Sequence, residues 1–181
     1  MRSWCAEGGG AVSACAKLFR KDIFASYRFA EGRLNEDHYS IVDILSRAGK
    51  IAIEPRPLYY YVHRRESITT SSFSKKSLDD LEAANKNYDI IKAKFPQALD
   101  VAEFRIDIST LKIIDKIMFS DNWKENPYLN ELVDHVRRNR CRILKSQYAT
   151  RERKLSVLLL LANRSLYQHI VKEKARRSWS G

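Results

Sequence analysis

The chain has 181 residues, of which 44% are hydrophobic and 10% aromatic, enough for one folded domain with an appendage. This composition excludes a wholly disordered chain, and 6 Gly with 4 Pro exclude a collagen-like or low-complexity protein. Residues 137–181 contain 13 Lys and Arg but only two acids, Glu152 and Glu173, so the whole net charge of +11 lies there. A basic tail behind a neutral body indicates an anionic partner, which is a membrane surface, a nucleic acid or an acidic protein; the alternative is a solvated tail that adds solubility.

The cysteines indicate a reducing compartment. Cys5, Cys15 and Cys141 have no metal-type spacing and are too few and odd in number for a disulfide framework. No apolar run approaches the roughly 18 residues of a membrane span, and the N-terminus lacks the apolar core of a secretory signal. We therefore expect a cytoplasmic protein.

The first 72 residues mix short helical and strand-like patterns. A strand or turn followed by a short helix is expected over residues 14–24. Gly32 indicates a loop, and the helix after it has Glu36 and Asp37 in its first turn, where acids interact favourably with the helix dipole. The apolar positions of this helix, which Gly49 follows, are Ile41, Ile44, Leu45 and Ala48.

Short strands are expected next. Residues 50–54 alternate apolar and polar side chains, which is the period of a strand. Pro55 and Pro57 interrupt the pattern, and residues 58–62 then form an aromatic run typical of a second strand at a sheet edge. Residues 1–72 should therefore contain a helix and two or three short strands.

Residues 73–140 change to the spacing of three and four that predicts helices. The first helix is expected between a capping box at Ser77-x-x-Asp80 and Pro96. The second covers residues 101–118, and the third begins at Asn126-Pro127 in the usual order of cap and proline. These three helices predict a small packed helical subdomain.

Residues 141–181 form a basic tail with one amphipathic helix expected over 150–174. Its leucine-rich face consists of Leu155, Leu158, Leu159, Ala162, Leu166 and Ile170. The cations that lie roughly opposite are Arg153, Lys154, Arg164 and Lys172. Such a helix either lies in a membrane interface or docks on the protein with a basic outer face, and the pattern alone favours neither.

Two clusters are suited to chemistry. In Glu36-Asp37-His38, the acids either complement the helix dipole or provide a general base that a neighbour orients. In the run from His63 to Ser67, Arg and Ser side chains suit phosphate oxygens, although a solvated loop is the simpler alternative. The sequence contains no HExxH, phosphate-loop, dinucleotide-binding or zinc-cluster motif.

The order of these segments adds a resemblance to the pattern. The segments are SACAKLFR at 13–20, RFAEGRLNEDH at 28–38, PLYYY at 57–61 and RRESIT at 64–69. Over about residues 11–72 the series resembles the C-terminal half of a bacterial family 2 glycosyltransferase with the GT-A fold, of the type that builds capsules, exopolysaccharide and lipopolysaccharide. Ala16 and Ala30 stand where that family usually has Asn and Pro.

The resemblance implies roles for individual residues. Asp37 matches the base that deprotonates the acceptor hydroxyl, and Glu36 matches its partner. Arg64 and Ser67 match the loop that closes over the donor diphosphate. His38 and His63, which lie in the same segments, complete the set of candidate substrate- and diphosphate-binding residues.

The resemblance also implies an architecture: an α/β remnant of a GT-A domain over 1–72, a helical subdomain over 73–140 and a basic tail over 141–181, with helix dominant overall. The family's nucleotide-binding half and its metal-binding Asp-x-Asp precede the Glu-Asp segment, and no such motif precedes it here. The chain therefore looks like the rear portion of an enzyme, with a divalent metal (Mn or Mg) expected in the intact protein and no metal site in this chain.

The partners that the resemblance implies are a nucleotide-sugar donor and a lipid- or saccharide-linked acceptor. We expect a peripheral location at the inner face of the cell membrane, with residues 150–174 against anionic lipid. The alternative is a non-catalytic helical module whose basic tail binds an anionic membrane or a partner protein. Nucleic-acid binding ranks last, because the tail lacks interleaved aromatic residues and any known motif.

Overall fold

The computed structural model describes residues 13–60, 62 and 73–179, and throughout these ranges the regular secondary structure is helical. The six α-helices are α2 (Glu36–Ser46), α3 (Asp79–Lys94), α4 (Leu99–Met118), α5 (Leu129–Lys145), α6 (Arg151–Ala162) and α7 (Arg164–Trp179). Short 3-10 turns cover Lys21–Phe24, Lys75–Leu78, Pro96–Ala98 and Trp123–Glu125. The expected dominance of helix is confirmed, and the expected α/β remnant is wrong.

The two strands expected at 50–54 and 58–62 are the main error. The described residues of both segments run as irregular chain, and the Tyr60 side chain is 92% exposed. A strand exists only where a neighbouring strand takes up its backbone N–H and C=O groups. No described residue between 50 and 60 takes part in a backbone–backbone hydrogen bond. The alternating pattern was therefore present without the partner that would turn it into a strand.

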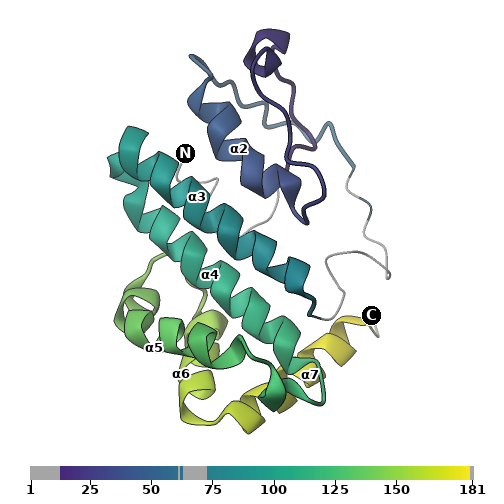
Figure 1. Cartoon of the computed structure of the whole chain (residues 1–181), viewed down its shortest axis with the longest axis vertical. Coiled ribbons are helices and arrows are strands. Elements are labelled where there is room, and N and C mark those ends of the chain that lie inside the picture. Colours follow the sequence, from purple (N-terminus) through teal and green to yellow (C-terminus); the bar gives the residue numbers. More distant parts are fainter. Residues whose placement is uncertain (1–12, 61, 63–72, 180–181) are drawn as a thin grey trace.

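Helix α4 is the centre of the fold. In Figure 1 it lies side by side with α3, with α2 on the far side of α3 and α5, α6 and α7 gathered on the other side of α4. Of its 20 residues 13 are buried, which an amphipathic surface helix would not show. Because α4 is covered on several sides, its buried charged side chains, Arg105 and Asp107, must find partners on the neighbouring helices.

The hydrophobic core has two parts. The larger one joins α4 to α5, α6 and α7 through buried side chains that include Phe104, Ile114, Val133 and Leu160. The smaller one joins α2, α3 and the start of α4; its buried members are Ile41, Val42, Leu45, Ile91, Ala98, Val101 and Ala102. The apolar stripe predicted for the helix after Gly32 therefore holds α2 against the helical body.

The sequence placed most helix boundaries well but misread one cap. Pro96 follows the end of α3, and Asn126 accepts the Tyr128 N–H at 3.0 Å just before α5, as expected. The capping box predicted at Ser77-x-x-Asp80 is wrong, because the Ser77 hydroxyl oxygen accepts the N–H of Ser74 at 3.2 Å. The Asp80 side chain is thereby left for a contact with another helix.

The tail helix expected over 150–174 is divided in two. It begins as predicted, with the Thr150 side chain accepting the Arg153 N–H, but α6 ends at Ala162. The Asn163 side chain then accepts the Leu166 N–H at 3.0 Å and starts α7. An asparagine at a helix N-cap is a known start signal. The α7 residue Lys174 contacts Glu152 of α6 at 3.2 Å, so the two helices fold back on one another.

Candidate active site at the start of helix α2

The start of α2 is set by a tight loop that rests on α3. Gly32 has φ +73° and Asn35 has φ +59°, a left-handed conformation that glycine adopts freely and asparagine tolerates. The Leu34 N–H donates to the Asp79 carboxylate at 2.9 Å, and the Arg33 guanidinium pairs with Glu82 at 2.7 Å. The loop and the first turn of α2 are thus held from outside.

Asp37 lies in this first turn, half-buried, with one carboxylate oxygen accepting the His38 backbone N–H at 2.7 Å. The negative charge of Asp37 acts on Cys15 and Lys17 of the segment 13–20. Burial lowers the pKa of Lys17, and the nearby Asp37 carboxylate opposes that shift. Hydrogen bonds from Ser13 and then Tyr59 lower the pKa of the exposed Cys15 thiol.

Three separated segments, 13–20, 28–38 and 57–61, are therefore linked around Cys15. The Asp37 charge acts on Lys17 and Cys15, and Tyr59 shares a hydrogen bond with Cys15. The arrangement offers a half-buried carboxylate at a helix start whose charge acts on a nearby lysine. A carboxylate in such a position can accept a proton from a hydroxyl group. Glu36, its neighbour in the chain, is exposed.

His38 does not face this site. It is 2% exposed, with its Nδ1 atom 2.8 Å from an Asp80 oxygen and its Nε2 atom accepting the Arg105 Nε–H at 3.3 Å. The contact with Arg105 requires an unprotonated Nε2, so the ring is neutral and Nδ1–H donates to Asp80. Burial and then the Arg105 charge lower the pKa of His38, against the hydrogen bond to Asp80.

Asp80 is the anion of this buried cluster. Burial alone would raise its pKa, but the hydrogen bond with His38 and the Arg105 guanidinium, 3.6 Å away, hold it well below its usual range. The cluster joins α2, α3 and α4, and so holds α2, the helix that carries Asp37, in place on the other two helices. Sequence reasoning missed Arg105 and took Asp80 for a cap; the available signal was a charged residue, Arg105, beside the apolar Phe104 in a core helix.

Three of the predicted site residues, Arg64, Ser67 and His63, lie outside the described residues. The structure consequently places Asp37 near Lys17 and Cys15, turns His38 into the interior and leaves Glu36 on the surface.

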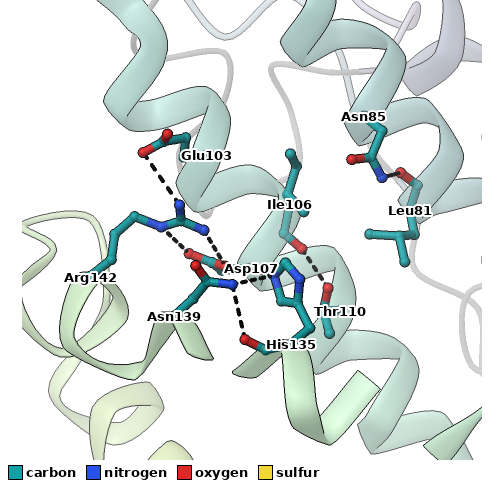
Figure 2. A network of polar contacts seen from close by, with 9 residues as sticks. All are labelled: Leu81, Asn85, Glu103, Ile106, Asp107, Thr110, His135, Asn139 and Arg142. Carbon is teal, nitrogen blue, oxygen red and sulfur yellow. Dashed lines mark hydrogen bonds and ion pairs between the residues drawn. The ribbon is translucent and has the colours of Figure 1, made fainter. Parts of the chain in front are cut away.

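A second polar cluster lies between α4 and α5 (Figure 2). The fully buried Asp107 carboxylate accepts two hydrogen bonds from Arg142, at 2.8 and 3.0 Å, and lies 2.9 Å from His135 Nε2. Glu103 contacts the same guanidinium at 3.5 Å. The Asn139 side-chain amide donates to the His135 carbonyl oxygen at 3.0 Å and also lies 3.3 Å from the same Nε2 atom. The Asp107 carboxylate is therefore paired with a guanidinium and an imidazole, as in a structural ion pair.

A third cluster joins α4 to the tail helices. Asp115 accepts a hydrogen bond from Arg153 of α6 at 2.9 Å and another from the Tyr167 hydroxyl of α7. Burial and the Asp115 charge raise the pKa of Tyr167, so its hydroxyl remains a donor. Helix α4 thus directs a charged residue toward each neighbouring group: Arg105 toward α2 and α3, Asp107 toward α5, and Asp115 toward α6 and α7.

No group of three or more His, Cys, Asp or Glu side chains in the described part of the chain could hold a metal ion. None of the helices described is both long and apolar enough to cross a membrane. Comparisons with protein-family models, with curated proteins and with solved structures give no match for this chain.

Proposed function

We propose that this chain is the acceptor-side portion of a family 2 glycosyltransferase of cell-surface polysaccharide synthesis, whose donor-binding half is supplied from outside these residues. The intact enzyme would transfer a sugar from a nucleotide-sugar donor to a hydroxyl group of a lipid- or saccharide-linked acceptor. The observation that supports this proposal is the link at the start of α2 from Asp37 to Lys17 and Cys15, and from Cys15 to Tyr59. The segments that take part are 13–20, 28–38 and 57–61, whose order carries the resemblance.

In this proposal Asp37 acts as the general base. Its carboxylate takes the proton of the acceptor hydroxyl while that oxygen attacks the anomeric carbon of the donor sugar. The bond from the anomeric carbon to the nucleoside diphosphate breaks, so the configuration inverts. Arg64 and Ser67 would bind the departing diphosphate through charge-assisted hydrogen bonds. A divalent metal would neutralise that diphosphate; the described residues offer no site for it, so no step assigned here depends on it.

The test is Asp37→Asn in the polypeptide that includes the donor-binding half. We expect sugar transfer to slow by about a hundredfold or more, the effect of losing a general base, while the free energy of unfolding changes little. Glu36→Gln, one residue away and exposed, is the matched control and should retain most of the rate. A loss below about threefold in Asp37→Asn would remove this residue from the catalytic role.

The isolated 181-residue chain gives a second check. It should show little or no transfer and should not bind a nucleotide sugar, because the half that binds the donor is outside it. Calorimetric titration with nucleotide sugars measures this directly. Binding with micromolar affinity would contradict the assignment of this chain to the acceptor side.

A second candidate is a non-catalytic helical module that acts through its basic tail at the inner face of the cell membrane. One observation favours it: Leu155 and Leu158 of α6 are exposed beside Arg151 and Lys154, which pair with no acidic side chain in the part of the chain that the structure describes. The partner would be an anionic membrane or a protein. The two candidates are compatible, because an enzyme with lipid-linked acceptors gains from a position at the membrane.

A further inference from the structure

The outward side of α6 combines leucines with cations. Leu155 is 66% exposed and Leu158 is 50% exposed, although both belong to the face expected to be the apolar side of the tail helix. Arg151, one turn before Leu155, is exposed, and Lys154 is partly exposed. The spacing of three and four places these four residues on one face of the helix.

The opposite side of α6 is fixed against the body. Arg153, expected on a solvent-facing basic side, pairs with Asp115 of α4, and Val157 and Leu160 are fully buried. Rotation of α6 about its axis to bury Leu155 and Leu158 would break the ion pair of Arg153 with Asp115. It would also expose Val157 and Leu160 to solvent. The leucine face therefore points outward because α4 attracts the arginine on the other side.

The cations of the outward face differ from those of α7. Among the described residues, neither Arg151 nor Lys154 has an acidic partner, whereas on α7 the side chains of Lys172 and Lys174 pair with Asp121 and Glu152. Two cations without an acidic partner among the described residues therefore lie beside the two exposed leucines of α6. This combination makes α6 the candidate contact helix.

We propose that this outward face of α6, defined by Arg151, Lys154, Leu155 and Leu158, binds the surface of an anionic lipid bilayer. The proposal rests on the second candidate function and not on sugar transfer. The helix axis would lie along the membrane plane, with the leucines among the acyl-chain ends and the two cations at the lipid phosphates.

Charge and shape favour a bilayer over other occupants. A second copy of the chain would bring two faces of the same positive charge together. A nucleic acid would neutralise the cations but leave the leucines in water, because this face has no aromatic side chain for base stacking. An anionic bilayer takes up both the charge and the apolar groups.

The experiment is co-sedimentation of the full chain with vesicles of phosphatidylcholine alone and of phosphatidylcholine mixed with phosphatidylglycerol. The wild-type chain should sediment with the mixed vesicles and stay in solution with the neutral ones. Arg151→Gln with Lys154→Gln should weaken binding by about thirtyfold, the effect of two cations near an anionic surface. Leu155→Gln with Leu158→Gln should weaken it by about tenfold or more.

The matched control removes the same charge elsewhere. Lys75 and Lys76 are exposed in the turn before α3, and Lys75→Gln with Lys76→Gln should leave binding within about threefold of wild type. All six substitutions are at exposed or partly exposed sites, and circular dichroism should show unchanged helix content.

Three results would overturn the proposal. The first is a wild-type chain that sediments with neither vesicle type or with both equally. The second is a loss in the lysine control as large as in the α6 charge variant, which would mean adsorption by net charge. The third is full binding by the leucine variant, or a dimer in solution that this variant dissociates. None of these results bears on the Asp37→Asn test, so the two proposals fail separately.

Discussion

The helical body from α3 to α7 and the segments on either side of α2 use similar residues with opposite results. In the body, apolar side chains at helical spacing are buried around α4, and its charged residues meet partners on each neighbouring helix. In the segments 13–34 and 47–62, Leu18, Ile53 and Tyr60 remain exposed. Burial in this chain follows from the presence of a packing partner and not from hydrophobicity.

The comparison also separates two kinds of polar contact. The buried ion pairs of the body join helices distant in sequence, as with Asp80 and Arg105. The pair of Arg20 and Asp22, at 2.9 Å in the N-terminal segment, is local and exposed. Exposed pairs contribute little to stability, whereas loss of one partner of a buried pair is costly. The same substitution should therefore have very different effects in the two regions.

The largest contrast is expected for aromatic truncation. Phe104→Ala removes a buried ring from the core around α4 and should lower the free energy of unfolding by about 3–5 kcal/mol. Tyr60→Ala removes an exposed ring and should change it by less than about 0.5 kcal/mol. Urea titration followed by circular dichroism measures both. A loss of more than about 2 kcal/mol in Tyr60→Ala would show that the segment 50–62 is packed.

A charge deletion sharpens the second comparison. Asp80→Ala leaves the buried Arg105 guanidinium without its anion and should cost about 3 kcal/mol. Asp22→Ala removes an exposed partner of Arg20, so its cost should stay below about 1 kcal/mol. Equal costs in the two variants, measured by urea unfolding, would mean that the cluster at α2, α3 and α4 is not desolvated as described.

The third prediction concerns the attachment of α7. Tyr167→Phe removes the hydroxyl that donates to Asp115 and keeps the ring, so stability should fall by about 1.5–2 kcal/mol. Tyr128→Phe, a half-buried tyrosine of the same body, is the control and should cost less than about 0.5 kcal/mol. Hydrogen exchange should also show faster exchange of α7 amides in Tyr167→Phe alone. No difference between the two variants would argue that α7 is held by its apolar contacts only.

Much of the helical body could be predicted from the sequence, because spacing of three and four reports helices without knowledge of their neighbours. The predicted positions of α2, α4 and α5 are confirmed, and the start of α6 at Thr150 was correct. The prediction of strands was wrong because a strand-like residue pattern at 50–54 and 58–62 does not show whether a neighbouring strand is present.

The prediction of which face of the tail helix meets solvent was wrong for a related reason. A helical wheel shows two sides but not which one meets Asp115, a residue about forty positions earlier in the chain. At the candidate site, the position of Asp37 in the first turn of a helix is confirmed, and its role stays a prediction. The cluster of Asp80, Arg105 and His38 was missed because its members become neighbours only when three helices pack.

The smallest predicted effect is a pH dependence that comes from this cluster. Burial lowers the folded-state pKa of His38 below the ordinary value of about 6.5, so the unfolded chain takes up a proton at a higher pH than the folded protein does. The stabilising contribution of neutral His38 is complete above about pH 6.5 and is lost as the pH falls below it. Stability should therefore decrease from about pH 7 to pH 5, with a slope from this group of at most about 1.4 kcal/mol per pH unit. Asp80, whose pKa is depressed, adds a loss only below about pH 4, outside this window.

His38→Gln, whose amide can still donate to Asp80 and accept from Arg105, should flatten the slope whatever its effect on absolute stability. The exposed His169→Gln should leave the slope unchanged. Urea unfolding across this pH range decides the matter, since an equal slope in His38→Gln and wild type would mean that His38 titrates alike in the folded and unfolded chain.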